Sequence, residues 1–252
     1  MDAPLTDLLP EYRKVMTPTA AGITLRQLMN HTSGLIGDPS LEYTVLTSEA
    51  DPVAWALSRQ EAQPHPPGRV FRYSSLGAHL AAAVLYSALQ HNPVSRGQSI
   101  LDYARARLFD PLGITTRPAT TITDPDYTGS GFGWARAGGV ELGSWGLRLT
   151  APDLAKLGQL YLQDGVWNGT RLLPEGWVAE ATTPGPVADQ VGLLWWHEYE
   201  GGFAARGYEG QRIVVIPDGR AVIVTLCATT PDDFALDEID YLINTLIRPA
   251  IA

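Results

Sequence analysis

The fold of this chain is decided by one stretch, Pro67-Gly68-Arg69-Val70-Phe71-Arg72-Tyr73-Ser74-Ser75. Beyond Ser75, apolar residues recur with a helical period as far as Leu89, so the stretch leads into the first turn of a helix. A tyrosine in such a place can act as a general base when a nearby cation lowers the pKa of its phenol from about 10. Tyr73 is therefore the first candidate catalytic residue. The alternative is a tyrosine that only packs against the helix start.

The composition is that of an ordinary globular protein with an acidic balance. Of the 252 residues, 45% are hydrophobic and 18% are charged, and the net charge is −9. No basic run offsets the acidity, which argues against a nucleic-acid partner. The longest apolar run is far shorter than the roughly 20 residues of a membrane span, and the N-terminus lacks the basic and apolar regions of a signal peptide. We expect a cytoplasmic protein if Met1 is the native start; otherwise the localisation is open, as is the oligomeric state.

Several kinds of chemistry lack their motifs. The five histidines form no His-Glu-x-x-His pattern, and there is one cysteine, so no metal site is predicted. Neither a Gly-x-Gly-x-x-Gly nor a Gly-x-x-x-x-Gly-Lys-Ser/Thr loop is present, and we expect no cofactor. A Gly-x-Ser-x-Gly elbow is also missing, which argues against an α/β-hydrolase.

Helical and strand patterns follow one another along the chain. Residues 1–185 are expected to be mostly helical with cleft loops, including a long loop over residues 114–147. Residues 186–252 are expected to form antiparallel strands and a closing helix, with a hairpin turn at Pro217-Asp218-Gly219. The expected strands are Val191–Trp196, Gly202–Arg206, Arg212–Ile216 and Ala221–Ala228. This order predicts an α+β fold that forms one domain overall.

Two segments of the first half resemble one family. The segment from Leu25 to Leu35 contains Asn30-His31-Thr32-Ser33-Gly34-Leu35 and is similar to the Leu-Leu-x-His-Thr-Ser-Gly-Leu signature of the serine β-lactamase and penicillin-binding-protein family. The resemblance is to the branch with class C β-lactamases, esterases and 6-aminohexanoate-dimer hydrolases. In that family this segment ends a helix and is structural, so Ser33 is not expected to be catalytic.

The opening stretch resembles a second signature of the same family, Pro-Gly-x-x-Phe-x-Tyr-Ser-Asn. The match implies that Tyr73 is the general base. It also implies that Ser75 stands at the place of the substrate-binding asparagine, with a hydroxyl instead of an amide.

The last third carries a third signature. Gly207-Tyr208-Glu209-Gly210-Gln211 resembles the family's Gly-His/Tyr-x-Gly-Gly-Gln segment, which holds its Lys-Thr-Gly or His-x-Gly motif. The resemblance implies that Tyr208, Glu209 and Gly210 contact substrate and that the backbone N–H of Gln211 donates to the oxyanion. Glu209 departs from the pattern, because its charge repels a carboxylate such as that of a β-lactam. This favours an ester or amide substrate without that carboxylate.

Together these segments imply the β-lactamase/DD-peptidase-like fold, an antiparallel sheet flanked by helices with a mostly helical subdomain. The family's first motif, Ser-x-x-Lys, does not occur in the sequence: Glu11 and Asp153 stand three residues before the two lysines. The resemblance implies that this motif, with the nucleophile helix and the first strands, precedes a segment like Met1–Tyr12. We therefore expect an N-terminally truncated serine hydrolase that acts by an acyl-enzyme route and is inactive alone. The alternative is a catalytically dead pseudo-enzyme or binding protein that keeps the cleft.

Overall fold

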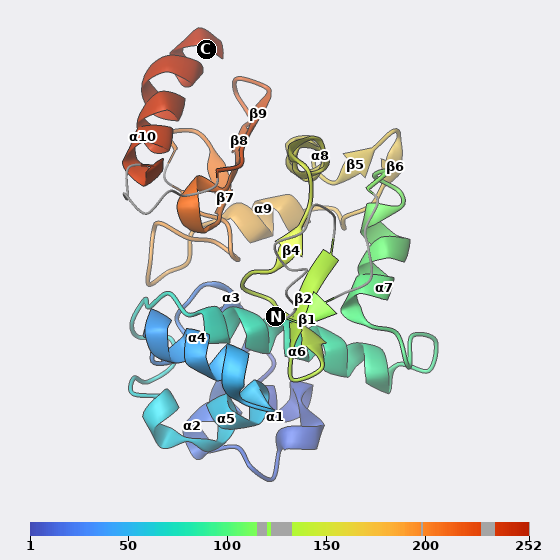
Figure 1. Cartoon of the computed structure of the whole chain (residues 1–252), viewed down its shortest axis with the longest axis vertical. Helices are drawn as coiled ribbons and strands as arrows, with labels where there is room; N and C mark the ends of the chain where they lie inside the picture. Colours follow the sequence, from blue (N-terminus) through green and yellow to red (C-terminus); the bar gives the residue numbers. More distant parts are fainter. Residues whose placement is uncertain (115–119, 122–132, 198, 228–234, 252) are drawn as a thin grey trace. The chain divides into compact units, whose positions relative to one another are not determined.

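The chain forms two compact units, Met1–Arg148 and Leu149–Ala252, in a computed structural model that describes residues 1–114, 120–121, 133–197, 199–227 and 235–251 (Figure 1). The boundary between the units follows Arg148. The sequence instead predicted a mostly helical region over residues 1–185 and strands with a closing helix over residues 186–252. The reason is α8 (Ala151–Leu162), which packs on β8 (Arg212–Ile216) and β9 (Ala221–Thr225) and so belongs with the strands.

The first unit is mainly helical. Its longest helix, α6 (Ser75–His91), contacts α3 (Leu25–Met29), α4 (Pro39–Ser48) and α5 (Pro52–Ser58). The shorter elements are α1 (Leu5–Leu8), α2 (Pro18–Gly22), α7 (Ile100–Ala104), the 3-10 turns Pro10–Tyr12 and Gln60–Ala62, and the π-helical turn Arg105–Phe109. The main core of this unit includes the fully buried side chains of Leu5, Leu28, Leu57, Leu76 and Leu80. Ile100 of α7 packs in a second cluster with Leu89 and Val140.

The helix starts follow the local sequence. Thr24 caps α3 in a capping box with Gln27, since its side chain accepts the Gln27 N–H while the Gln27 side chain accepts the Thr24 N–H. Ser74 caps α6 by accepting the N–H of Gly77 at 2.8 Å. These caps set where the helices begin.

A small sheet occupies part of the segment expected to be a long loop. Here β2 (Gly133–Ala137) pairs with β1 (Thr120–Thr121), β3 (Val140–Glu141) and β4 (Leu147–Arg148). The loop expectation was wrong for these residues, because Gly138 and Gly139 adopt positive φ and make the two-residue turn of a β-hairpin. Residues 115–119 and 122–132 of the expected loop lie outside the described residues.

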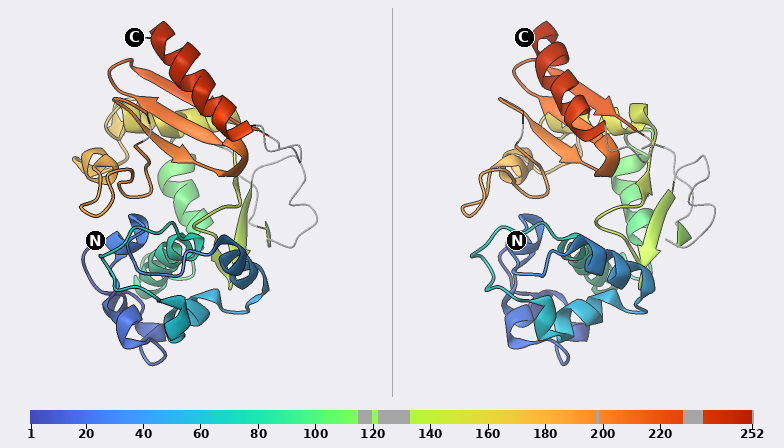
Figure 2. Two further views of the ribbon diagram at one scale, coloured as in Figure 1. Left: turned by 90° about the vertical axis from the view of Figure 1, so that its left-hand side faces the viewer. Right: turned by 60° about the vertical axis from the view of Figure 1, so that its left-hand side comes forward.

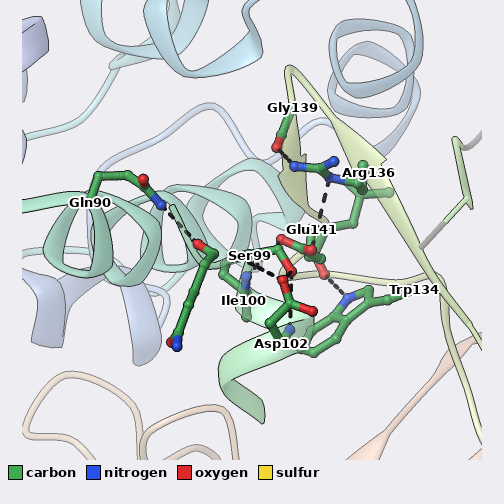
Figure 3. Close-up of polar contacts among 10 residues, drawn as sticks. Gln90, Ser99, Ile100, Asp102, Trp134, Arg136, Gly139 and Glu141 are labelled. Carbon is green, nitrogen blue, oxygen red and sulfur yellow. Dashed lines mark hydrogen bonds and ion pairs between the residues drawn. The ribbon is translucent and has the colours of Figure 1, made fainter. Parts of the chain in front are cut away.

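A buried glutamate joins this sheet to α7. Glu141 is fully buried on β3, and its Oε2 accepts the Ile100 N–H at 3.2 Å, at the first residue of α7 (Figure 3). Its Oε1 lies 3.9 Å from Arg136 Nε. Ser99 and Asp102 form a capping box at the same helix start.

The second unit is an antiparallel sheet with helices. The sheet runs β7 (Phe203–Arg206), β8, β9, and Ile216 pairs with Ala221 across the predicted turn at 217–219. The other elements are β5 (Val166–Trp167), β6 (Thr170–Arg171), α9 (Trp177–Thr182), α10 (Ala235–Leu242), the π-helical turn Ile243–Ile247 and α11 (Arg248–Ile251). The expected strand Val191–Trp196 makes isolated bridges only.

The C-terminal helix lies along one face of this sheet (Figure 2). Ile239 and Ile243 of the helix bury their side chains in a cluster with Val214 and Ile216 of β8. On α8, Gly158 lets the helix approach closely, because an added Cβ there would lie 2.5 Å from Val222 Cγ1. None of the helices in the described part of the chain is long and apolar enough to cross a membrane.

Candidate active site

Tyr73 lies immediately before the helix cap Ser74, where the sequence predicted it. Its side chain is 43% exposed, whereas Ser74 is fully buried and Ser75 is half-buried as the first residue of α6. The phenol is thus accessible while the backbone that carries it is fixed by a buried helix start.

A carboxylate that the sequence motifs did not indicate holds this helix start. Glu42 of α4 is 1% exposed, and it accepts the Ser74 hydroxyl at 2.6 Å and the N–H groups of Ser75 at 2.7 Å and Leu76 at 3.3 Å. Burial raises the pKa of Glu42 above its ordinary value, while the hydrogen bonds from these partners oppose that rise. Each partner donates, which is the arrangement an ionised carboxylate requires.

His31 contacts the same stretch. Its ring lies 4.7 Å from the Tyr73 ring, centroid to centroid, and its Nδ1 accepts the Ser74 N–H at 3.3 Å. Burial lowers the pKa of His31 to about 4, so the ring is neutral near pH 7, as an accepting Nδ1 requires. The His31 carbonyl also accepts the Arg72 N–H at 2.8 Å. His31 is thus a structural partner of the Tyr73 stretch.

The backbone also packs closely around the Tyr73 stretch. Gly37 has a φ of 59°, and an added Cβ would lie 2.7 Å from the Tyr73 carbonyl oxygen. Arg72 Nη1 donates to the Ile36 carbonyl at 3.0 Å in the same loop. Ser33 accepts the Leu35 N–H at 3.4 Å inside its own turn.

In the second unit, the Tyr208–Gly210 segment forms a 3-10 turn between β7 and β8. Tyr208 is 80% exposed, and the side chain of Glu209 lies outside the described part of the chain. Gly210 has a φ of 82°, and its carbonyl accepts the Thr225 hydroxyl at 2.6 Å. The Gln211 N–H donates to the Tyr208 carbonyl over a long 3.4 Å.

A buried arginine, paired with a half-buried aspartate, fixes this turn. Arg212, which is 2% exposed, donates through Nη1 to the carbonyls of Gly207 and Gln211, each at 3.0 Å. Its Nε lies 3.2 Å from Asp240 Oδ1 on α10, and the Tyr199 hydroxyl donates to the same carboxylate. The bonds to Arg212 and Tyr199 lower the pKa of Asp240 below its ordinary value, and desolvation opposes this shift.

Three tryptophans make ring contacts. Trp195 packs 4.4 Å from the Tyr161 ring and 5.1 Å from the Phe203 ring, an aromatic cluster within the second unit. Trp145 stacks on Tyr43 at 5.9 Å, and Trp196 lies 5.7 Å from the Arg206 guanidinium carbon. Within the described residues, no group of three or more His, Cys, Asp or Glu side chains is arranged to hold a metal ion.

The residues predicted for the site therefore fall into two groups, each within its own unit. Tyr73 and Ser75 share the α6 start, and Tyr208, Gly210 and Gln211 share the turn between β7 and β8. The sequence motifs missed Glu42 and the Arg212–Asp240 pair. Neither belongs to a local pattern, because their partners lie 32 and 28 residues away.

The chain is similar to known proteins. The β-lactamase family model matches residues 1–245. Penicillin-binding protein 4 of Amycolatopsis lactamdurans is 28% identical over 197 residues, which are 69% of this chain and 47% of that protein, so the chain spans about half the length of this relative.

Two solved structures share the fold. A Bacillus anthracis protein assigned as a 6-aminohexanoate-dimer hydrolase matches with a TM-score of 0.67 at 19% identity, covering 98% of this chain and 66% of that one. A Bacteroides dorei DSM 17855 protein assigned as a β-lactamase matches with a TM-score of 0.66 at 20% identity, covering 93% and 73%. With the family match over almost its whole length, the chain belongs to the β-lactamase family.

Proposed function

We propose that these residues carry the general base and the oxyanion turn of an active-site-serine hydrolase that cleaves an ester or amide bond. The observation that carries the proposal is Tyr73, an exposed phenol on a backbone held by buried polar partners at the start of α6. Such preorganisation is what general-base catalysis needs.

The proposed reaction has two steps. A serine hydroxyl attacks the carbonyl carbon of the substrate, and its proton passes to Tyr73 Oη and then to the leaving group as the acyl-enzyme forms. Water then attacks the acyl carbon and Tyr73 Oη takes the water proton. Tyr73 passes that proton to the serine Oγ as the acyl C–Oγ bond breaks and the acid product leaves. The serine and its lysine belong to the Ser-x-x-Lys motif, which is absent from this sequence, so the proposal assigns them to polypeptide outside it.

The turn at residues 208–211 is proposed to stabilise the oxyanion. The Gln211 N–H makes only a long bond of 3.4 Å to Tyr208, so a charged oxygen would be a better acceptor. Glu209 brings a negative charge to this turn in the sequence. An ester or amide without a nearby carboxylate is therefore the proposed substrate class.

Labelling with a fluorescent phosphonate tests the proposal. We expect no serine labelling in the 252-residue chain. Labelling is expected in the product of an in-frame upstream extension that encodes Ser-x-x-Lys. In that longer protein, Tyr73→Phe should lower kcat on p-nitrophenyl butyrate by about 10²–10⁴-fold, the usual size of a general-base contribution.

The matched control is Tyr43→Phe, which alters another exposed tyrosine of the first unit and should leave kcat unchanged. A labelled serine in the short chain would contradict the proposal, as would a Tyr73→Phe protein with full activity. A native reading frame that starts at Met1, with ligand binding and no turnover, would instead favour the pseudo-enzyme.

A further inference from the structure

The buried carboxylate of Glu42 has more bonds than a helix cap needs. Ser74 already caps α6 through its own hydroxyl, which accepts the Gly77 N–H. Glu42 accepts further bonds from the Ser74 hydroxyl and from the backbone N–H groups of the next two residues, and Glu42 itself is only 1% exposed. Burying a carboxylate is unfavourable unless it is fully paired. A buried carboxylate such as Glu42 is therefore weak evidence that its hydrogen bonds serve the stability of the fold alone.

These bonds fall on the residues that directly follow Tyr73. On its other side in the sequence, the Arg72 N–H donates to the His31 carbonyl at 2.8 Å. The backbone is therefore fixed immediately before and immediately after Tyr73. The His31 ring, 4.7 Å away, then restricts the phenol itself.

We infer that Glu42 is a positioning residue for Tyr73: it fixes the backbone from Ser74 to Leu76 so that the phenol is presented in one orientation. The inference rests on the proposed role of Tyr73 as general base. Misplacing a catalytic group by about 1 Å can cost about 100-fold in rate, so such a residue acts on kcat rather than on substrate binding.

The chain offers a matched control. Glu141 is also a fully buried glutamate that accepts a backbone N–H at a helix start, that of Ile100, but its hydrogen bond is to α7 rather than to the residues that follow Tyr73. Comparing Glu42→Gln with Glu141→Gln separates positioning of Tyr73 from a general effect of removing a buried charge. The glutamine retains one acceptor oxygen, which favours folding; Glu42→Ala is the more severe variant.

The first measurement uses the 252-residue chain labelled with 3-fluorotyrosine, with Tyr73→Phe to assign the Tyr73 resonance. One sharp 19F line is expected for Tyr73 in the unsubstituted protein and in Glu141→Gln. In Glu42→Gln and Glu42→Ala the line should broaden at least twofold or split. An unchanged Tyr73 line in folded Glu42 variants would overturn the inference.

The second measurement uses the longer protein that contains Ser-x-x-Lys. Glu42→Gln should lower kcat by about 10- to 100-fold with KM within about twofold, whereas Glu141→Gln should leave both unchanged. Equal losses in the two variants would also overturn the inference. If the longer protein shows no turnover at all, the proposed function fails, and the 19F comparison still decides whether Glu42 orders Tyr73.

Discussion

Replacing Ser74 by alanine should destabilise the first unit much more than the equivalent change at another helix cap. The hydroxyl of Ser74 accepts the Gly77 N–H at 2.8 Å and donates to Glu42 at 2.6 Å, and the residue is fully buried. Losing the cap costs about 1 kcal/mol. Losing a hydrogen bond to a buried carboxylate costs about 1.5–3 kcal/mol more. The free energy of unfolding should therefore fall by about 2.5–4 kcal/mol.

Ser99→Ala is the matched comparison. Ser99 caps α7 by accepting the Asp102 N–H at 3.0 Å, and it donates to the same residue's carboxylate at 2.7 Å, but Asp102 is exposed to solvent. Water replaces that second bond, so we expect a loss of about 1 kcal/mol.

Pulsed hydrogen exchange at increasing urea concentration, read by mass spectrometry, follows the peptides of the first unit separately from those of the second. The unfolding midpoint for first-unit peptides should fall by at least twice as much in Ser74→Ala as in Ser99→Ala. Equal shifts would refute the reasoning, because they would mean that the Glu42 carboxylate does not depend on the Ser74 hydroxyl.

Three further predictions concern buried groups. Burial lowers the pKa of His79 to about 4, and both of its ring nitrogens lack hydrogen-bond partners among the described residues. The free energy of unfolding is therefore unaffected by His79 above pH 6.5, and it should fall by roughly 3 kcal/mol as the pH drops from 6.5 toward 4, because the unfolded chain binds a proton that buried His79 does not. His79→Leu should remove this loss and flatten the acid side of a Tm–pH profile. Gly158→Ala should lower the stability of the second unit by about 1–2 kcal/mol despite a better helix propensity, because the new Cβ would lie 2.5 Å from Val222 Cγ1 and 2.9 Å from Ile213 Cγ2. Adding Val222→Ala removes the closer overlap and should restore part of the urea midpoint. Asp240→Asn should cost about 1.5–3 kcal/mol, the usual value of hydrogen bonds between charged groups, because the buried Arg212 guanidinium loses this charged partner and keeps its bonds to the Gly207 and Gln211 carbonyls. An unchanged Tm would contradict this account.

Much of the fold follows from local sequence. Several features were predictable because each depends on residues within a few positions of one another. They are the helix cap at Thr24, the cap at Thr150 before α8, and the strand Arg212–Ile216. The sheet around β2 was not predictable in this way. Its strands are short, and the Gly138-Gly139 turn is the only strong local signal.

The sequence by itself determined the family of this protein and the positions of the two motifs that carry its candidate site. Tyr73 and the Tyr208–Gln211 segment could be identified because motif residues are adjacent in the chain. Only the tertiary structure decided what holds them: Glu42 and His31 at the start of α6, and Arg212 with Asp240 at the turn. These contacts join residues 28 to 43 positions apart, and their strength depends on burial, which residue spacing does not specify.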